Sequence, residues 1–283
     1  MAVTTRVAAW QCSPGPGDVA GNLRRLDAAC ASAAERRVEV LVTPEMFTSG
    51  YGITLAEVLR LAEEPGGPTE TAVAEIARSH RLAIVYGHPE RAPGTRGSEA
   101  RGSEARGSED GAYNAATMIG ADGVVRGRHR KVHLFGDLDR RQFAANGERP
   151  SAFDFDGSRV GMLICYDVEF PEAVRSLAVG GAEAIFVPTA NMTGCDEVQE
   201  FLVRARACEN NCPVVYANYC GADDVFEYNG QSTICGPRGE VLAQADAKGE
   251  ELVIADLPGA SSATYLADRR ADLYDPGQQV RAD

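Results

Sequence analysis

Short runs of aliphatic residues alternate with amphipathic helical segments along most of this 283-residue chain. Because strands with a period of two and helices with a period of 3.6 residues alternate, the pattern predicts an α/β fold with mixed sheets. Two hairpins are expected, at 115–119 with 123–134 and at 232–235 with 239–243. Further strands are expected at 3–10, 38–42, 82–87, 160–164, 184–187, 214–218 and 251–256, and helices at 19–36, 70–79, 172–179 and 197–211.

A cysteine stands where one of these apolar runs ends. Residues 160–164 predict a buried strand, Cys165 follows, and Pro171 opens a predicted helix. A cysteine in this place can act as a nucleophile, because the helix dipole and unpaired N–H groups favour the thiolate and can hold an oxyanion. A buried cysteine can equally serve as a small hydrophobic residue. This segment alone leaves both interpretations open.

A glutamate occupies the corresponding place after another apolar run. Residues 40–42 are aliphatic, Pro44 and Glu45 follow, and residues 50–52 predict a turn. Apolar surroundings would desolvate the Glu45 carboxyl and raise its pKa toward the range of a general base. A solvated loop carboxylate is the commoner state of a single glutamate.

A basic segment supplies the third candidate. Residues 128–136 change from a cationic run to an alternating pattern, which predicts a strand with Lys131 and His133 on one face. Arg128 and Arg130 fit a solvated edge strand.

Glu45, Lys131 and Cys165, in this order, resemble the catalytic triad of the nitrilase superfamily of carbon–nitrogen hydrolases. Within the superfamily, residues 133–140 and 216–222 look most like the aliphatic amidase branch, near the 5-aminopentanamidases and R-stereoselective amidases. The resemblance implies an α/β fold built as a four-layer α-β-β-α sandwich with two mixed β-sheets, and a homodimer or higher homo-oligomer. It covers nearly the whole chain, through segments 7–11, 44–47, 130–134, 165–172, 187–192 and 204–210.

The resemblance also implies a mechanism. Glu45 would take the proton of Cys165, the sulfur would attack an amide carbon, and Lys131 with the backbone N–H of Tyr166 would hold the oxyanion. Ammonia would leave a thioester, which water activated by Glu45 would hydrolyse. One oxyanion donor can contribute about 3 kcal/mol. No metal, nucleotide, flavin or other cofactor is needed. Cysteine–histidine catalysis stays an alternative, because the chain has four histidines.

The chain departs from the family pattern at the second acid. Family members usually carry another glutamate a few residues after the lysine, but no glutamate lies between Lys131 and Glu148. Asp139 matches the family spacing best, and Asp137 is the alternative. Either aspartate could also be a loop-capping carboxylate.

Two further residues are candidates for binding the substrate. Asn191 follows the apolar run 185–187, in a loop that borders the substrate site in this family. Glu172 is an acid expected near the same rim, together with Asp196 and Glu197. A cationic substrate tail could pair with one of these carboxylates, provided that the pair is partly buried.

Composition limits the partners of the chain. A net charge of −13 argues against nucleic acid binding and would suit a cationic substrate. No apolar run approaches the roughly 18 residues that a membrane span needs, and no signal peptide precedes the first strand. The eight cysteines include no Cys-x-x-Cys pair and predict free thiols. We expect a cytoplasmic enzyme without nucleic acid or membrane partners.

A short tandem repeat interrupts the pattern. Arg-Gly-Ser-Glu-Ala occurs at 96–100 and 101–105, and nearly recurs from Arg106. Such a polar repeat cannot build a core and predicts a flexible loop at about 94–110. We expect residues 1–283 to form one carbon–nitrogen hydrolase domain around it.

Three function classes follow. The first is an amidase that hydrolyses a small aliphatic carboxamide, with a cationic ω-amino or ω-guanidino tail, to a carboxylic acid and ammonia. The second is a nitrilase or an N-carbamoyl amino acid amidohydrolase that uses the same residues. The third is a non-catalytic binding protein, which an intact triad disfavours.

Overall fold

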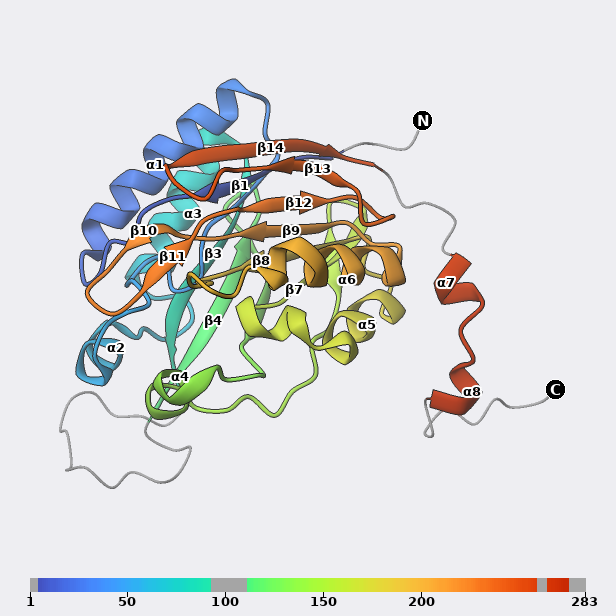
Figure 1. Cartoon of the computed structure of the whole chain (residues 1–283). Helices are drawn as coiled ribbons and strands as arrows, with labels where there is room; N and C mark the ends of the chain where they lie inside the picture. The colour runs from blue at the N-terminus through green and yellow to red at the C-terminus, as the bar shows by residue number, and fades with distance from the viewer. Residues whose placement is uncertain (1–4, 93–110, 259–263, 275–283) are drawn as a thin grey trace.

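The computed structural model describes residues 5–92, 111–258 and 264–274. The loop expected at about 94–110 lies outside the described residues. The strands of the described part form two six-stranded sheets and one small ribbon (Figure 1).

The first sheet has the strand order β14-β1-β2-β3-β4-β5. β1, β2 and β3 run parallel to one another, whereas β14, β4 and β5 pair antiparallel with their neighbours. Its central strands are covered on both faces, which is why their sequences read as continuous apolar runs. The strands are β1 (Thr5–Gln11), β2 (Val40–Val42), β3 (Ala83–Arg91), β4 (Ala112–Ile119), β5 (Val125–Arg130) and β14 (Glu251–Leu257).

The second sheet has the order β13-β12-β9-β8-β7-β6, with β7, β8 and β9 parallel. β6, β12 and β13 complete it in antiparallel pairs. These strands are β6 (Phe153–Phe155), β7 (Ser158–Met162), β8 (Ala184–Pro188), β9 (Val214–Ala217), β12 (Thr233–Cys235) and β13 (Val241–Gln244), and the separate ribbon consists of β10 (Cys220–Ala222) and β11 (Glu227–Asn229).

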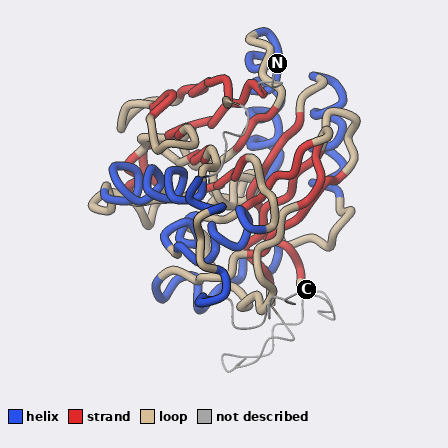
Figure 2. The backbone as a smooth tube through the Cα atoms, turned by 90° about the vertical axis from the view of Figure 1, so that its right-hand side faces the viewer, coloured by secondary structure: helices blue, strands red, loops and turns tan. Residues whose placement is uncertain are grey.

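Helices cover the outer faces of the two sheets, so that strands lie between helices in the rotated view (Figure 2). α1 (Val19–Glu35) and α3 (Pro68–His80) cover the first sheet, and α5 (Pro171–Val179) and α6 (Val203–Asn210) cover the second. The remaining helices are α2 (Leu55–Leu61), α4 (Gly136–Gln142), the 3-10 helix η1 (Cys165–Glu169), the π-helix η2 (Val198–Leu202), α7 (Thr264–Ala267) and α8 (Ala271–Tyr274). None of the helices in the described ranges has the length and apolar character to cross a membrane.

Three apolar layers hold the elements together. Val7 and Ala9 of β1 pack between the two sheets, while Ala8 and Trp10 of the same strand pack under the helices of the first sheet. The third layer lies between the second sheet and α5 and α6. Successive strand residues point to opposite faces, so one apolar run serves two layers. The predicted α-β-β-α sandwich with two mixed sheets is therefore confirmed.

Local differences from the sequence-based expectation concern the site. The strand expected at 123–134 ends at Arg130, so Lys131 and His133 do not share a strand face; both lie in the following loop. The helix expected at 197–211 is divided into η2 and α6. α4 occupies a segment for which no helix was predicted, and its first turn contains both candidate aspartates.

Candidate active site

Glu45 lies in a tight loop directly after β2. Its backbone N–H donates to Thr189 O across the two sheets (3.2 Å), and its side chain is fully buried. Gly87 of β3 makes room for this loop, since a Cβ at Gly87 would lie 2.4 Å from Met46 N and 2.8 Å from Pro44 O. Sheet packing therefore fixes where the Glu45 carboxylate lies.

Lys131 follows the last residue of β5, and its backbone N–H still donates to Asn114 O of β4 (2.8 Å). Its ammonium Nζ lies 2.7 Å from Glu45 Oε1 and 2.7 Å from Asp139 Oδ2, with all three side chains buried. Burial alone would lower the pKa of Lys131, but the two carboxylates hold that pKa well above its ordinary range. The lysine is thus a fixed cation between two anions.

Asp139 makes the contact that a family glutamate would make. Its Oδ2 also accepts from Phe135 N (2.9 Å), and its Oδ1 accepts from Tyr51 OH (2.8 Å). α4 carries the shorter aspartate close enough for a direct contact, so no bridging water is required. Asp137 points outward with 83% of its side chain exposed and lies 3.9 Å from Arg140. Of the two candidates, the structure brings only Asp139 to Lys131.

Cys165 begins η1 with a left-handed backbone, φ 45°. Part of the residue remains exposed, and the Ala190 backbone N–H donates to its sulfur. Burial of the thiol and the nearby charge of Glu45 raise the pKa of Cys165 well above the ordinary value of 9.0. The expectation that the helix end would favour a thiolate is therefore wrong: α5 begins only at Pro171, and desolvation dominates. The raised pKa favours the thiol of Cys165 over the thiolate.

The Glu45 carboxylate has one engaged and one free oxygen. Oε1 accepts from Lys131 Nζ and from Asn114 Nδ2 (2.6 Å), whereas Oε2 is buried without a hydrogen-bond partner among the described residues. Burial raises the pKa of Glu45, which Lys131 and Asn114 oppose. A buried acceptor without a partner is costly and marks a place where a proton can be taken. Oε2 is therefore the oxygen of this carboxylate that no described group engages.

A buried aspartate joins the lysine loop to the cysteine turn. Asp167 accepts from His133 N (2.8 Å), His133 Nδ1 (2.8 Å) and His129 Nε2 (2.9 Å), and from Ile164 N (3.2 Å) next to the cysteine. Although burial alone would raise the pKa of Asp167, the hydrogen bonds from His129 and His133 hold it well below its usual range. The histidines on either side of Lys131 thus serve this link.

The other predicted site residues have distinct surroundings. Asn191 is buried, and its amide donates to Cys195 O (2.9 Å) and Gln199 Oε1 (3.0 Å), which holds the loop that carries Ala190. Tyr166 follows Cys165, and its backbone N–H makes no hydrogen bond within the described residues. Glu172 is exposed in the first turn of α5.

Sequence reasoning missed three contributors: Asn114 and Tyr51, which donate to Glu45 and Asp139, and Asp167. Arg206 Nε and Nη2 donate to Val168 O (3.1 Å) and Glu169 O (2.7 Å), which anchors η1 on α6. Only Asp167 carried a local signal, because it lies two residues after Cys165. The others are brought in by contacts between distant strands and helices.

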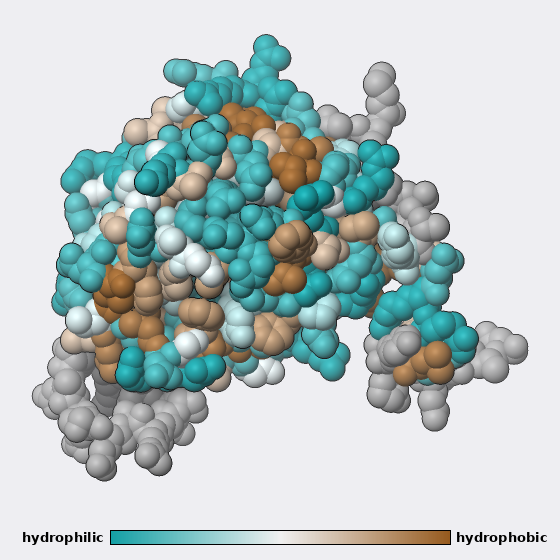
Figure 3. Space-filling model, viewed as in Figure 1, coloured by the Kyte–Doolittle hydropathy of each residue, from teal (hydrophilic) through white to brown (hydrophobic). Residues whose placement is uncertain are grey.

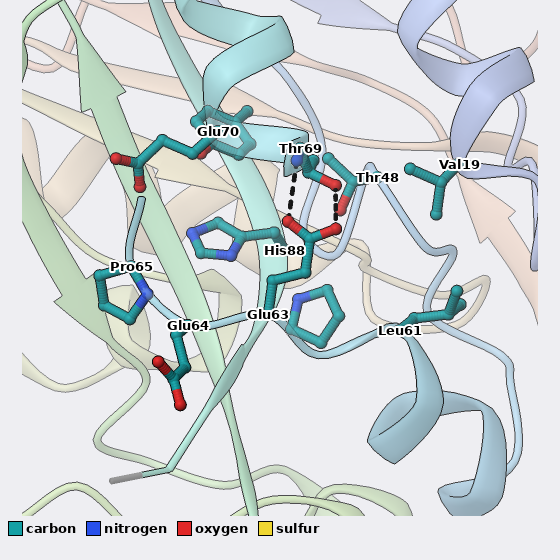
Figure 4. A pocket seen from close by; sticks show the side chains of 11 residues that line it. Val19, Thr48, Leu61, Glu63, Glu64, Pro65, Thr69, Glu70 and His88 are labelled. Carbon is teal, nitrogen blue, oxygen red and sulfur yellow. Dashed lines mark hydrogen bonds between the residues drawn. The ribbon is translucent and has the colours of Figure 1, made fainter. Parts of the chain in front are cut away.

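The pocket drawn in Figure 4 is a separate feature, lined by residues of α3, β3 and the α2–α3 loop. Glu63 accepts there from Thr69 N and Thr69 Oγ1, both at 2.8 Å. His88 Nε2 lies 2.8 Å from Thr117 Oγ1, and burial lowers the pKa of His88 to about 4. Protein groups already engage these side chains, so we assign no chemistry to this pocket.

Comparison with known proteins identifies the family. The model of the carbon–nitrogen hydrolase family, "Carbon-nitrogen hydrolase", matches residues 6–265. The chain belongs to the carbon–nitrogen hydrolases. This confirms the predicted membership in the nitrilase superfamily and that the chain is an enzyme of this class. The match includes Glu45, Lys131, Asp139 and Cys165 and therefore spans the whole cluster described above.

Individual relatives of this carbon–nitrogen hydrolase support the same family assignment. It is 46% identical over 278 residues to the "Hydrolase in pqqF 5'region" of Pseudomonas protegens, covering 96% of this chain and 91% of the relative. It is 33% identical to an (R)-stereoselective amidase of Pseudomonas sp., covering 91% and 88%. A solved glutamate-to-glutamine mutant of an amidase from Nesterenkonia sp. AN1 is 31% identical and superposes with a TM-score of 0.79, with 97% of each chain covered. That mutant carries the acetamide moiety of fluoroacetamide on its active-site cysteine.

Proposed function

We propose that this carbon–nitrogen hydrolase is an amidase that converts a small aliphatic carboxamide to a carboxylic acid and ammonia through a thioester on Cys165. One observation carries the proposal. A buried cluster of Glu45, Lys131 and Asp139 lies beside a protonated cysteine and leaves one Glu45 oxygen without a partner. In this proposal Glu45 supplies a base, Lys131 a fixed cation and Cys165 a nucleophile.

In the proposed acylation step, Glu45 Oε2 takes the proton of Cys165 as the sulfur attacks the amide carbon. The ammonium of Lys131 and the backbone N–H of Tyr166 hold the negative oxygen of the tetrahedral intermediate. Glu45 then returns the proton to the departing nitrogen, the carbon–nitrogen bond breaks, and ammonia leaves. Preorganised donors of this kind are the largest single contribution in many acyl-transfer enzymes.

In the deacylation step, Glu45 takes a proton from water, which attacks the thioester carbon. The carbon–sulfur bond breaks, the thiol regains its proton, and the carboxylic acid leaves. Asp139 keeps Lys131 charged and in place during both steps, because Lys131 Nζ contacts Asp139 Oδ2 as closely as it contacts Glu45. The residues present suffice for both steps.

The proposal extends to the substrate tail. A net charge of −13 attracts small cations, which supports an amide with an ω-amino or ω-guanidino tail. A nitrilase or N-carbamoyl hydrolase on the same residues is the second candidate. It is favoured by the Pyrococcus abyssi relative named "Nitrilase", which is 31% identical over 89% of this chain.

Ammonia release from a substrate panel tests the reaction class. The panel contains 5-aminopentanamide, 4-guanidinobutyramide, glutaramate, a plain nitrile and an N-carbamoyl amino acid. We expect the two cationic amides to be hydrolysed fastest. Turnover of the nitrile or the carbamoyl compound without turnover of any amide would contradict the proposal.

We also propose a cytoplasmic homodimer formed by one-domain subunits. The eight free cysteines support a reducing compartment. Figure 3 shows apolar patches on an otherwise hydrophilic face, and large apolar side chains are exposed on the α5 and η2 side, with Phe201 at 64%. Light scattering of the wild type and of Phe201→Asp tests this interface; a monomeric wild type would contradict it.

A further inference from the structure

Glu169 ends the 3-10 helix that Cys165 begins, and no sequence pattern singled it out. Four residues along a 3-10 helix span about 8 Å, so this carboxylate lies a short alkyl chain away from the nucleophile. Its side chain is only partly buried. Its charge acts on the Cys165 thiol and on the thiol of Cys195, in the loop after Asn191, so the carboxylate lies near both.

Two cations, Lys131 and Arg206, act on this carboxylate from nearby, but neither forms an ion pair with it. Within the described part of the chain, the Glu169 side chain makes no hydrogen bond and no ion pair. Arg206, whose charge acts on Glu169, directs its guanidinium to the Val168 and Glu169 carbonyls and to Glu209 Oε1 (3.1 Å). Lys131 is held by Glu45 and Asp139. Both neighbouring cations are therefore engaged elsewhere.

The carboxylates considered from sequence are less suited to bind a substrate cation. Asp196 Oδ1 already accepts from Gln231 Nε2 (3.0 Å) and Asn229 Nδ2 (3.2 Å). Glu172 and Glu197 are exposed, and water screens an exposed pair so that it contributes little. Of these four described acids, Glu169 is the one that combines partial burial, a carboxylate without an ion pair and a position four residues from Cys165.

We infer that the Glu169 carboxylate binds the cationic end of the substrate and thereby sets the tail preference of the enzyme. This inference rests on the proposed amidase function. The ammonium or guanidinium of the tail would donate to Glu169 while the amide carbon at the other end lies against Cys165 Sγ. A neutral tail would leave a partly desolvated carboxylate unpaired, which disfavours binding.

The titration of Glu169 supplies an independent signature. Burial and the nearby Glu197 raise the pKa of Glu169 to about 7, against the opposing charges of Lys131 and Arg206. The carboxyl is therefore neutral well below pH 7 and charged well above it. Since the amine of the tail stays protonated over this range, the preference for a cationic tail should increase from pH 6 to pH 8.

The test is the ratio of kcat/KM for 5-aminopentanamide to kcat/KM for hexanamide, which has a tail of similar length without charge. Both amides use the same catalytic residues, so their common pH dependence cancels in the ratio. We expect a wild-type ratio of about tenfold or more at pH 8, equivalent to about 1.4 kcal/mol, and a lower ratio at pH 6. Glu169→Gln should bring the ratio near one at both pH values.

Control variants separate this role from a general effect of charge. Glu200→Gln removes an exposed acid on the neighbouring η2 and should keep the wild-type ratio and its pH dependence. Glu169→Lys should reverse the preference toward glutaramate. The inference would be overturned if Glu169→Gln kept the wild-type ratio, or if Glu172→Gln lost that ratio instead. In either case, turnover of hexanamide would still support the proposed amidase function. A wild type that releases ammonia from neither amide would overturn both.

Discussion

The ammonium nitrogen of Lys131 lies 2.7 Å from the carboxylate of Asp139, a residue one methylene shorter than the glutamate that the family usually carries. The contact is direct because α4 starts at Gly136 and brings Asp139 inward while Asp137 stays outside. Tyr51 and the backbone of Phe135 hold the same carboxylate. The position of α4 thus lets the shorter side chain contact Lys131 directly.

Replacing Asp139 should reduce turnover far more than replacing Asp137. Asp139→Asn keeps the shape but removes the anion that holds Lys131, so we expect kcat to fall by about 10²-fold, the size of losing one oxyanion donor. Asp137→Asn changes an exposed residue and serves as the matched control. Steady-state kinetics of both variants on one amide measures this difference. An equal fall in kcat in both variants would contradict the assignment of Asp139 as the partner of Lys131.

Glu45 should control the reactivity of Cys165. Because burial and Glu45 raise the pKa of the thiol, Cys165 reacts only when a base takes its proton. Glu45→Gln keeps the size and removes the base, so alkylation of Cys165 by iodoacetamide should slow by at least about 10²-fold, within the range of general-base catalysis.

Cys195 and Cys208, which are also partly exposed, provide the internal control for that experiment. Their labelling, followed by peptide mass spectrometry, should be the same in wild type and Glu45→Gln. Unchanged labelling of Cys165 in the variant would show that Glu45 is not its base.

Asp167 should stabilise the fold in a pH-dependent way. Its folded pKa lies below the unfolded value of about 3.8, so its contribution to stability is complete above about pH 5 and is lost as the pH falls toward the folded pKa. Thermal unfolding of wild type and Asp167→Asn should differ most near neutral pH and converge below pH 4. A difference that grows on acidification would contradict the proposed link to His129 and His133.

Gly87 should be required for the position of Glu45. A Cβ at this residue would meet backbone atoms of the Glu45 loop rather than a movable side chain. Gly87→Ala should therefore destabilise the fold by about 1–3 kcal/mol, as overpacking does, and lower kcat. Gly147→Ala, where a Cβ meets no atom within 4 Å, is the matched control for both denaturant unfolding and kinetics.

The sequence predicted what depends on local pattern. Apolar runs located most strands, and Glu45 and Cys165 stood out because each follows such a run. Lys131 was found but placed on a strand, since alternation continues beyond Arg130 although the ladder ends there. The helix of Asp139 was missed because seven residues with two aspartates and two arginines carry no apolar period.

What the sequence could not predict depends on distant contacts. The choice of Asp139 over Asp137 needed Tyr51, 88 residues away. The protonated state of Cys165 reflects desolvation by surrounding elements, which outweighs the helix end that the local motif suggested. Glu169 became informative only once Arg206 was seen to contact backbone carbonyls instead.

The most direct test of the account is detection of the acyl group on Cys165 during turnover. The enzyme is mixed with 5-aminopentanamide, quenched in acid within the first turnovers, digested and analysed by peptide mass spectrometry. We predict that the peptide containing Cys165 gains the mass of the substrate minus ammonia, and that Cys165→Ala shows neither adduct nor ammonia release. Full activity of Cys165→Ala, or an adduct on another residue in the active wild type, would contradict the account.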